Sequence, residues 1–264
     1  MKFKKNKMTH YIHSPLTLSC LSYSTILPTT IRFSDQGGVC IKEEHIPFLL
    51  HERLEELSFG DSARFQTGIW KDFLAKLLAL RKLRVLKLNN ALPGTLTYKL
   101  VYRSPVSKTL LRLEFQFVFF ETRTLGLLSQ ALAYNCIARE LTLSFCVFKT
   151  NHHHSDWLWR LRNSTITRFK FSGQKFACDE LFCFSRTLEY IVQSRRSRRD
   201  CLIVSTALDR SKCKGRFFLA ALKSFIASME RMQQNVQTLH TIRICQQFHK
   251  KVQHYFRSLL NNTV

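Results

Sequence analysis

The sequence contains little glycine and proline, 8 and 5 residues of 264, which excludes a collagen-like chain and a low-complexity linker. Acidic residues are scarce as well: 18 Asp and Glu stand against 41 Lys and Arg and give a formal net charge of +23. Apolar residues are plentiful, since they make up 45% of the chain and include 22 Phe. A chain with this much apolar side-chain area can bury a core, so wholesale disorder is excluded.

Long hydrophobic runs are missing. The most apolar stretch, residues 110–120, is interrupted by charged and polar side chains and is too short to cross a bilayer. The residues that follow the basic N-terminus mix Leu with Ser, Thr, Tyr and Pro, unlike the core of a signal peptide. We therefore expect an intracellular protein without a membrane partner. The sequence does not distinguish cytoplasm, nucleus and cytoskeleton.

Catalytic and metal-binding motifs are also missing. The sequence has no G-x-x-x-x-G-K, G-x-S-x-G or H-E-x-x-H, and nothing orders its Cys and His residues into a dyad. Its nine cysteines include no pair of C-x-x-C motifs, so we expect reduced thiols rather than a zinc finger. Adjacent side chains such as His152–His154 converge poorly on one ion and indicate a loop insertion, while Trp157 and Trp159 are expected to anchor the next helix. We expect no enzyme activity, cofactor or metal.

A short pattern recurs along the chain: apolar, two others, apolar, one other, apolar. Its second apolar position falls at successive steps of 29, 27, 28 and 28 residues, too even for an accident. Weaker copies include residues 31–33, 202–204 and 239–244. The clear copies have that second apolar residue at Leu57, Leu86, Leu113, Leu141 and Phe169.

The segments between the copies mostly have apolar residues at helical spacing. Residues 92–109 are the exception, because Pro93, Gly94 and Pro105 interrupt them. The middle of that segment, residues 95–102, is either a short helix or an extended connection. The expected helices are 70–78, 125–132, 156–161, 179–192, 217–232 and 248–260.

A strand of the form L-x-x-L-x-L followed by a helix, at 27–29 residues per unit, resembles the leucine-rich repeat of the ribonuclease-inhibitor-like subfamily. The best local match is residues 131–146, where Asn135 and Cys146 stand at the family's loop and turn positions. The resemblance implies an α/β leucine-rich-repeat solenoid, or horseshoe, with a concave parallel β-sheet and convex helices. In the other copies the turn position carries residues that leave the turn's backbone groups without the family's usual partner: Ser62, Ala91, Val118 and Gln174.

This reading also divides the chain. We expect residues 1–25 to be a basic, poorly ordered N-terminal segment. Residues 26–264 form a monomeric solenoid of about seven or eight repeats. The repeats are clearest in 54–171, and insertions or degenerate units fall in 172–240.

One residue of each predicted strand lies between two core positions and points away from the core, because strand side chains alternate. These residues should line the concave face and bind a partner protein. Most of the charged ones are basic, which favours an acidic partner surface, although a row of merely solvated strand residues is the alternative. The predicted row is Arg32, Ser58, Lys87, Glu114, Thr142, Lys170 and Arg243, with Arg84, Arg112, Glu140 and Arg168 beside it.

A compact basic cluster follows the helix expected at 179–192. It consists of Arg195, Arg196, Arg198 and Arg199 around Ser197. It is a nuclear-import signal, an RNA or phosphate patch, a site of Ser197 phosphorylation, or a solvated loop whose arginines favour a helix C-terminus.

The leading functional hypothesis is a non-catalytic scaffold that binds another protein through the concave sheet. The alternative is a nucleic-acid-associated basic protein, motivated by the net charge and the arginine cluster. Lesser alternatives come from the repeat type: a structural subunit of cilia or axonemes, or a protein of the Ran GTPase-activating type.

Overall fold

The chain forms two compact units, residues 1–166 and 167–264. The computed structural model describes residues 8–24, 26–60, 63–89, 94–134, 137–149, 154–161, 164–176, 178–194, 201–208, 223–225, 227–228 and 231.

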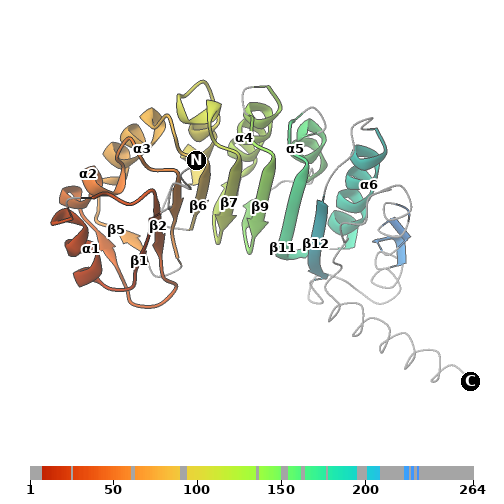
Figure 1. Ribbon diagram of the computed structural model, residues 1–264. Coiled ribbons are helices and arrows are strands. Elements are labelled where there is room, and N and C mark those ends of the chain that lie inside the picture. Colours follow the sequence, from red (N-terminus) through yellow and green to blue (C-terminus); the bar gives the residue numbers. More distant parts are fainter. Residues whose placement is uncertain are drawn as a thin grey trace, which may run out of the picture. The chain divides into compact units, whose positions relative to one another are not determined.

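The first unit is built on a parallel sheet in which the strands follow one another in chain order (Figure 1). Two short parallel pairs lie outside this sheet, β3 (Cys40–Ile41) with β5 (Arg64–Phe65) and β8 (Phe119–Glu121) with β10 (Val147–Lys149). The main strands, in spatial order, are β1 (Thr9–Ile12), β2 (Thr30–Phe33), β4 (Glu56–Ser58), β6 (Val85–Leu88), β7 (Arg112–Gln116) and β9 (Glu140–Ser144).

Helices connect the strands, as a parallel sheet requires. The expected helices at 70–78, 125–132 and 156–161 are present, and the undecided segment 95–102 is mainly a 3-10 helix. The helical elements are α1 (Pro15–Ser22), η1 (Glu43–His45), α2 (Ile46–Leu49), α3 (Trp70–Ala79), η2 (Gly94–Leu100), η3 (Val106–Lys108), α4 (Thr122–Tyr134) and α5 (His154–Arg160).

The core of this unit lies between the sheet and the helices. Leu57, Leu86, Leu113 and Leu141 pair in register across neighbouring strands, and each is at most 1% exposed. Stacking these side chains in adjacent strands buries apolar area that one strand and helix could not bury alone.

Phenylalanine rings extend the core towards the helices. Phe59 follows β4 and packs edge-on against Phe73 of α3, with ring centroids 5.7 Å apart. Further along, Phe148 of β10 stacks on Trp157 of α5 at 5.9 Å. Trp157 is buried, so the expectation that it anchors its helix is confirmed. The helices lie on the side of the sheet to which the buried leucines point.

The N-terminal segment contains regular structure that the sequence did not predict. Residues 1–25 were expected to be poorly ordered, but β1 and α1 lie within them. α1 begins at a reciprocal cap: the Thr17 N–H donates to Ser14 Oγ, and the Ser14 N–H donates to Thr17 Oγ1. Pro15 then fits the first helical position, and Leu18 is buried, so local capping and burial together order this segment.

The second unit contains a parallel pair, β11 (Arg168–Phe176) and β12 (Cys201–Leu208), and α6 (Cys178–Ser194). Phe171 of β11 stacks on Phe184 of α6, with ring centroids 4.7 Å apart. The helix expected at 179–192 is therefore present. Of the helix expected at 217–232, only residues 223–225, 227–228 and 231 are described, and these are helical; the predictions at 239–244 and 248–260 lie outside the described residues.

No helix among the described residues is long and apolar enough to span a membrane.

Candidate interaction surface

The predicted outward row forms one ladder across the first unit. Arg32 pairs with Ser58, Ser58 with Lys87, Lys87 with Glu114, and Glu114 with Thr142. Arg32 is exposed and the next three residues are partly exposed, but Thr142 is buried and cannot be reached by a partner. In the second unit, Lys170 of β11 pairs with Ile203 and is exposed. Arg243 lies outside the described residues.

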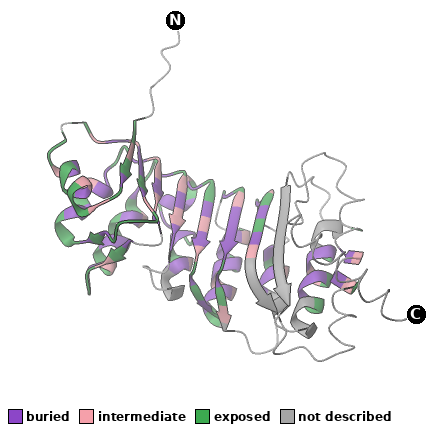
Figure 2. Cartoon of the chain, turned by 90° about the horizontal axis from the view of Figure 1, so that it is seen from below, coloured by how far each residue is buried: buried purple, intermediate pink, exposed green. Residues whose placement is uncertain are grey.

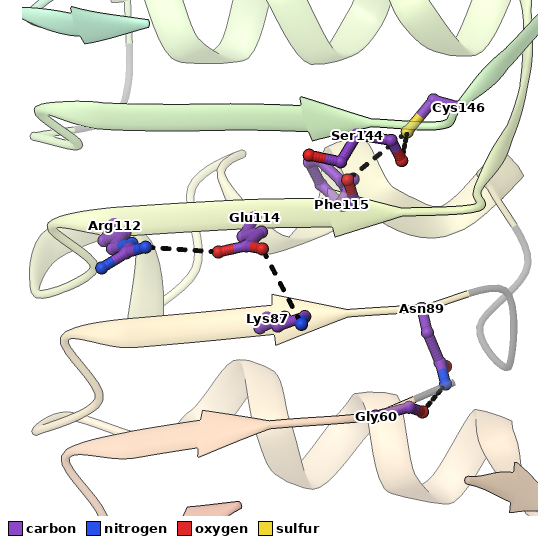
Figure 3. Close-up of polar contacts among 8 residues, drawn as sticks. All are labelled: Gly60, Lys87, Asn89, Arg112, Glu114, Phe115, Ser144 and Cys146. Atoms are coloured by element: carbon purple, nitrogen blue, oxygen red, sulfur yellow. Dashed lines mark hydrogen bonds and ion pairs between the residues drawn. The ribbon is translucent and has the colours of Figure 1, made fainter. Parts of the chain in front are cut away.

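The cations of this ladder are matched by carboxylates. Arg32 Nε lies 2.7 Å from Glu56 Oε1, and Lys87 Nζ lies 3.9 Å from Glu114 Oε1. Arg112 lies between two acids: its Nη2 is 3.4 Å from Glu114 Oε2 (Figure 3). Its Nε is 3.7 Å from Glu140 Oε2. Surface pairs of this kind add little stability, but they hold long side chains in one arrangement.

This pairing changes the expected charge of the face. The prediction of an acidic partner counted one residue per strand and found mostly cations. Glu56 and Glu140 stand two residues before that position and share its face, because strand side chains repeat every second residue. The described face of the first unit therefore carries charges of both signs, paired with one another.

Arg84 does not extend the row. It lies directly before Val85, the first residue of β6. Val85, and not Arg84, pairs with Arg112 on the neighbouring strand. The shift of one residue places Arg84 at the edge of the sheet where the strands begin. Arg168 is the first residue of β11 and is exposed.

Figure 2 shows the strands in front of the helices, with buried, intermediate and exposed residues following one another along them. The ladder residues alternate along the strands with the buried leucines of the core, so the ladder occupies the side of the sheet away from the helices of this unit. Such a side is available to a partner without any rearrangement of the core.

Polar side chains at the ends of the strands satisfy backbone groups of the turns. The Asn89 amide, buried beyond β6, donates to the Gly60 carbonyl and lies 3.4 Å from the Ala63 carbonyl. Cys146 is buried beyond β9, and its Sγ lies 3.5 Å from the Phe115 and Ser144 carbonyl oxygens (Figure 3). Burial raises the pKa of the Cys146 thiol to about 12. Both residues are structural.

Sequence reasoning missed Asn89 and a pair of aromatic residues. Phe117 and Phe145 each follow the last residue of a strand, have φ angles of 55° and 52°, and are 41% and 51% exposed. Left-handed backbone is rare for phenylalanine and marks a position worth attention. Their even spacing, 28 residues apart, was the available signal.

The remaining predicted sites are the histidine run and the basic cluster. In the described part of the chain, no group of three or more His, Cys, Asp or Glu side chains is arranged to hold a metal ion. His154 is the first residue of α5, while His152 and His153 lie outside the described residues. The same is true of Arg195, Arg196, Arg198 and Arg199.

Compared with known proteins, the sequence matches no protein-family model and no curated protein. The geometry alone defines the class: an α/β protein with a parallel sheet whose side away from the helices presents an ordered ladder of charged and polar residues.

Proposed function

We propose that this chain is a non-catalytic interaction protein that binds another protein across the side of its parallel sheet away from the helices. We further propose that its strand and helix units are degenerate leucine-rich repeats of a solenoid. The even step of the pattern and the in-register leucines support the second statement.

One observation carries the functional proposal. The ladder from Arg32 to Glu114 is at least partly exposed, and ion pairs of Arg32 with Glu56 and of Lys87 with Glu114 hold its charged side chains in position. Side chains that are already ordered lose less conformational entropy when a partner binds. Charges of both signs on the face select a partner whose own charges are placed in the complementary arrangement.

The test is an exchange of one pair. Arg32→Glu with Glu56→Arg keeps both the net charge and the ion pair but reverses its direction on the face. Proteins captured from lysate after nuclease treatment by the parent chain should be lost with this double variant. A control variant, Lys99→Glu with Arg123→Glu, changes exposed cations away from the ladder and should retain them.

The alternative function, association with nucleic acid, is favoured by the net charge of +23. It predicts that the captured material disappears with nuclease and between about 50 and 200 mM salt, the range over which phosphate contacts weaken steeply. The interaction proposal is contradicted if the captured material is lost on nuclease treatment but is still captured by the variant with the exchanged pair.

A further inference from the structure

Six cations that have no carboxylate partner lie at one edge of the first unit. All six are exposed, and within the described part of the chain none lies within 4.0 Å of a carboxylate oxygen, in contrast to the cations of the ladder. They all lie in the segments that precede the strands, with Lys108 at the end of η3: Arg53, Arg81, Lys82, Arg84, Arg103 and Lys108.

Backbone hydrogen bonds bring these loops together. The Arg84 N–H donates to the Glu55 carbonyl at 2.7 Å, and the Leu111 N–H donates to the Arg84 carbonyl at 2.8 Å. The Arg139 N–H continues the series to Leu111 at 2.8 Å. Because these bonds connect neighbouring strands at their first residues, the cations share one edge of the sheet.

A groove of about 790 Å³ follows this edge. Met8, Ile26 and Leu27 line it where β1 and β2 begin. Arg53, Lys82 and Arg84 line it where β4 and β6 begin, together with one carboxylate, Glu55. The groove has an apolar end and a cationic end. An adjoining hollow of about 450 Å³, lined by Arg81, Arg103 and Lys108, continues the positive surface.

The length of the groove suits an extended chain. It reaches from Met8, before β1, to Thr109, before β7, and so passes the starts of β1, β2, β4, β6 and β7. At about 4.8 Å between neighbouring strands this is about 19 Å, which an extended peptide covers with about six residues at about 3.3 Å each.

We propose that this groove binds an extended segment of another protein with apolar side chains at one end and a cluster of Asp and Glu side chains at the other. The cations supply charge complementarity for the acidic end. Met8 and Ile26 are 44% and 61% exposed and offer apolar surface for the other end. The occupant is not a segment of this chain, whose own acidic residues are adjacent in pairs at most.

A nucleic acid fits this groove less well. Phosphates would engage the arginines and lysines but leave the apolar end unused. Single strands are usually held by bases stacked on aromatic rings, and the groove's described lining contains none. Binding of a peptide at this edge of the sheet does not depend on binding of a partner at the face of the sheet.

The experiment uses the full chain and fluorescein-labelled peptides, with binding measured by fluorescence anisotropy. The probe has three leucines followed by four glutamates, and it is also made in the reverse order because the direction of binding is open. Lys82→Glu with Arg84→Glu should weaken binding of the better peptide by about tenfold or more. Lys99→Glu with Arg123→Glu removes the same charge elsewhere and should change it by less than about twofold. Ile26→Ser should weaken the leucine peptide but not a peptide in which serines replace the leucines.

Four results overturn the proposal: equal weakening by the two double variants, equal binding of the serine peptide, absence of peptide binding, or preferential binding of a 12-nucleotide oligouridine that the groove variant abolishes. Circular dichroism checks that each variant is folded, and Arg53→Glu replaces the double variant if it is not. The exchanged pair at Arg32 and Glu56 should leave peptide binding unchanged, because neither residue lines the groove. The experiments therefore distinguish a failure of the proposed binding at the sheet face from a failure of the proposed peptide binding at the sheet edge.

Discussion

Phe117 and Phe145 stack with ring centroids 5.3 Å apart and an angle of 19° between their planes, each on a left-handed residue just after a strand. The Phe117 N–H donates to the Ser144 carbonyl at 3.0 Å, so the two turns are joined by backbone as well as by side chain. The stack is worth about 0.5–1.5 kcal/mol. The left-handed conformation costs each residue about 1–2 kcal/mol.

These opposing effects predict an unusual order of stability. Phe117→Ala loses the stack and keeps the backbone cost, whereas Phe117→Gly loses the stack and removes that cost. The glycine variant should therefore be more stable than the alanine variant by about 1 kcal/mol in urea unfolding. At the exposed strand residue Phe119 the order should be the usual one, with alanine more stable. A glycine variant of Phe117 that is less stable than its alanine variant contradicts the argument.

Asn89 should contribute more to stability than its equivalent in the next strand. Leu88 pairs with Phe115, so Asn89 corresponds to Gln116, which is partly exposed. Asn89→Ala leaves buried carbonyl groups of the neighbouring turn without their donor and should lower the free energy of unfolding by about 1–3 kcal/mol. Gln116→Ala is the control and should cost less than about 0.5 kcal/mol. Equal losses in the two variants would refute a special role for the Asn89 amide.

Two glycines should respond in opposite directions to alanine. A Cβ at Gly60 would lie 2.2 Å from the Ser34 carbonyl oxygen, which is fixed backbone. Gly126 is in α4, and a Cβ there meets nothing within 4 Å. Gly126→Ala should raise the free energy of unfolding by about 0.5–1 kcal/mol, and Gly60→Ala should lower it by more than that amount. Thermal and urea unfolding of the two variants measure both effects, and a tolerated Gly60→Ala contradicts the close approach.

The cysteines should differ sharply in reactivity. Cys20, Cys40 and Cys183 are exposed, while Cys146 is buried with its thiol pKa raised to about 12. A rise from 9 to about 12 lowers the thiolate fraction roughly a thousandfold, and burial also blocks access. Limited alkylation with iodoacetamide at neutral pH, followed by peptide mapping, should modify the three exposed thiols first. In denaturant Cys146 should react at a comparable rate, and early native-state modification of Cys146 contradicts the prediction.

Stability should fall in mild acid. Burial lowers the pKa of His51, and the nearby positive charge of Arg53 acts in the same direction. Burial also lowers the pKa of His45, whose Nδ1 accepts the Lys42 N–H at 3.0 Å. A lowered pKa in the folded state means that the unfolded chain takes up protons first, so the free energy of unfolding decreases as the pH drops below about 6.5.

Urea unfolding between pH 5 and 8 measures this slope. His51→Gln should flatten it, because the variant lacks one group whose pKa is lowered in the folded state. An unchanged slope in His51→Gln contradicts the assignment.

Much of the first unit was predictable because leucines recur at nearly constant steps and lock the register of neighbouring strands. The misses have local causes. α1 depends on the reciprocal contact of Ser14 with Thr17, which neither residue reveals alone. Arg84 stands one residue away from the position that faces the same side as the row, and a shift of one residue along a strand changes the side of the sheet.

The charge of the face was misjudged for a different reason. The predicted row had Glu140 beside it but not Glu56, and both lie two positions away from the row on the same side of the sheet. The turn partner Asn89 was missed because it directly follows Leu88, whereas the repeat pattern directs attention three residues beyond that leucine. Pairwise geometry across strands thus decides what a single-strand pattern leaves open.

Glu114 contacts two cations at once, Lys87 on the neighbouring strand and Arg112 on its own. Its replacement by a neutral residue therefore leaves two positive side chains with one acidic neighbour, Glu140, between them and the next strand. In evolutionary terms, a single codon change at position 114 removes one negative charge from this face and leaves Lys87 without its carboxylate, while the leucine core beneath it is untouched. The charge of the face can therefore change independently of the fold.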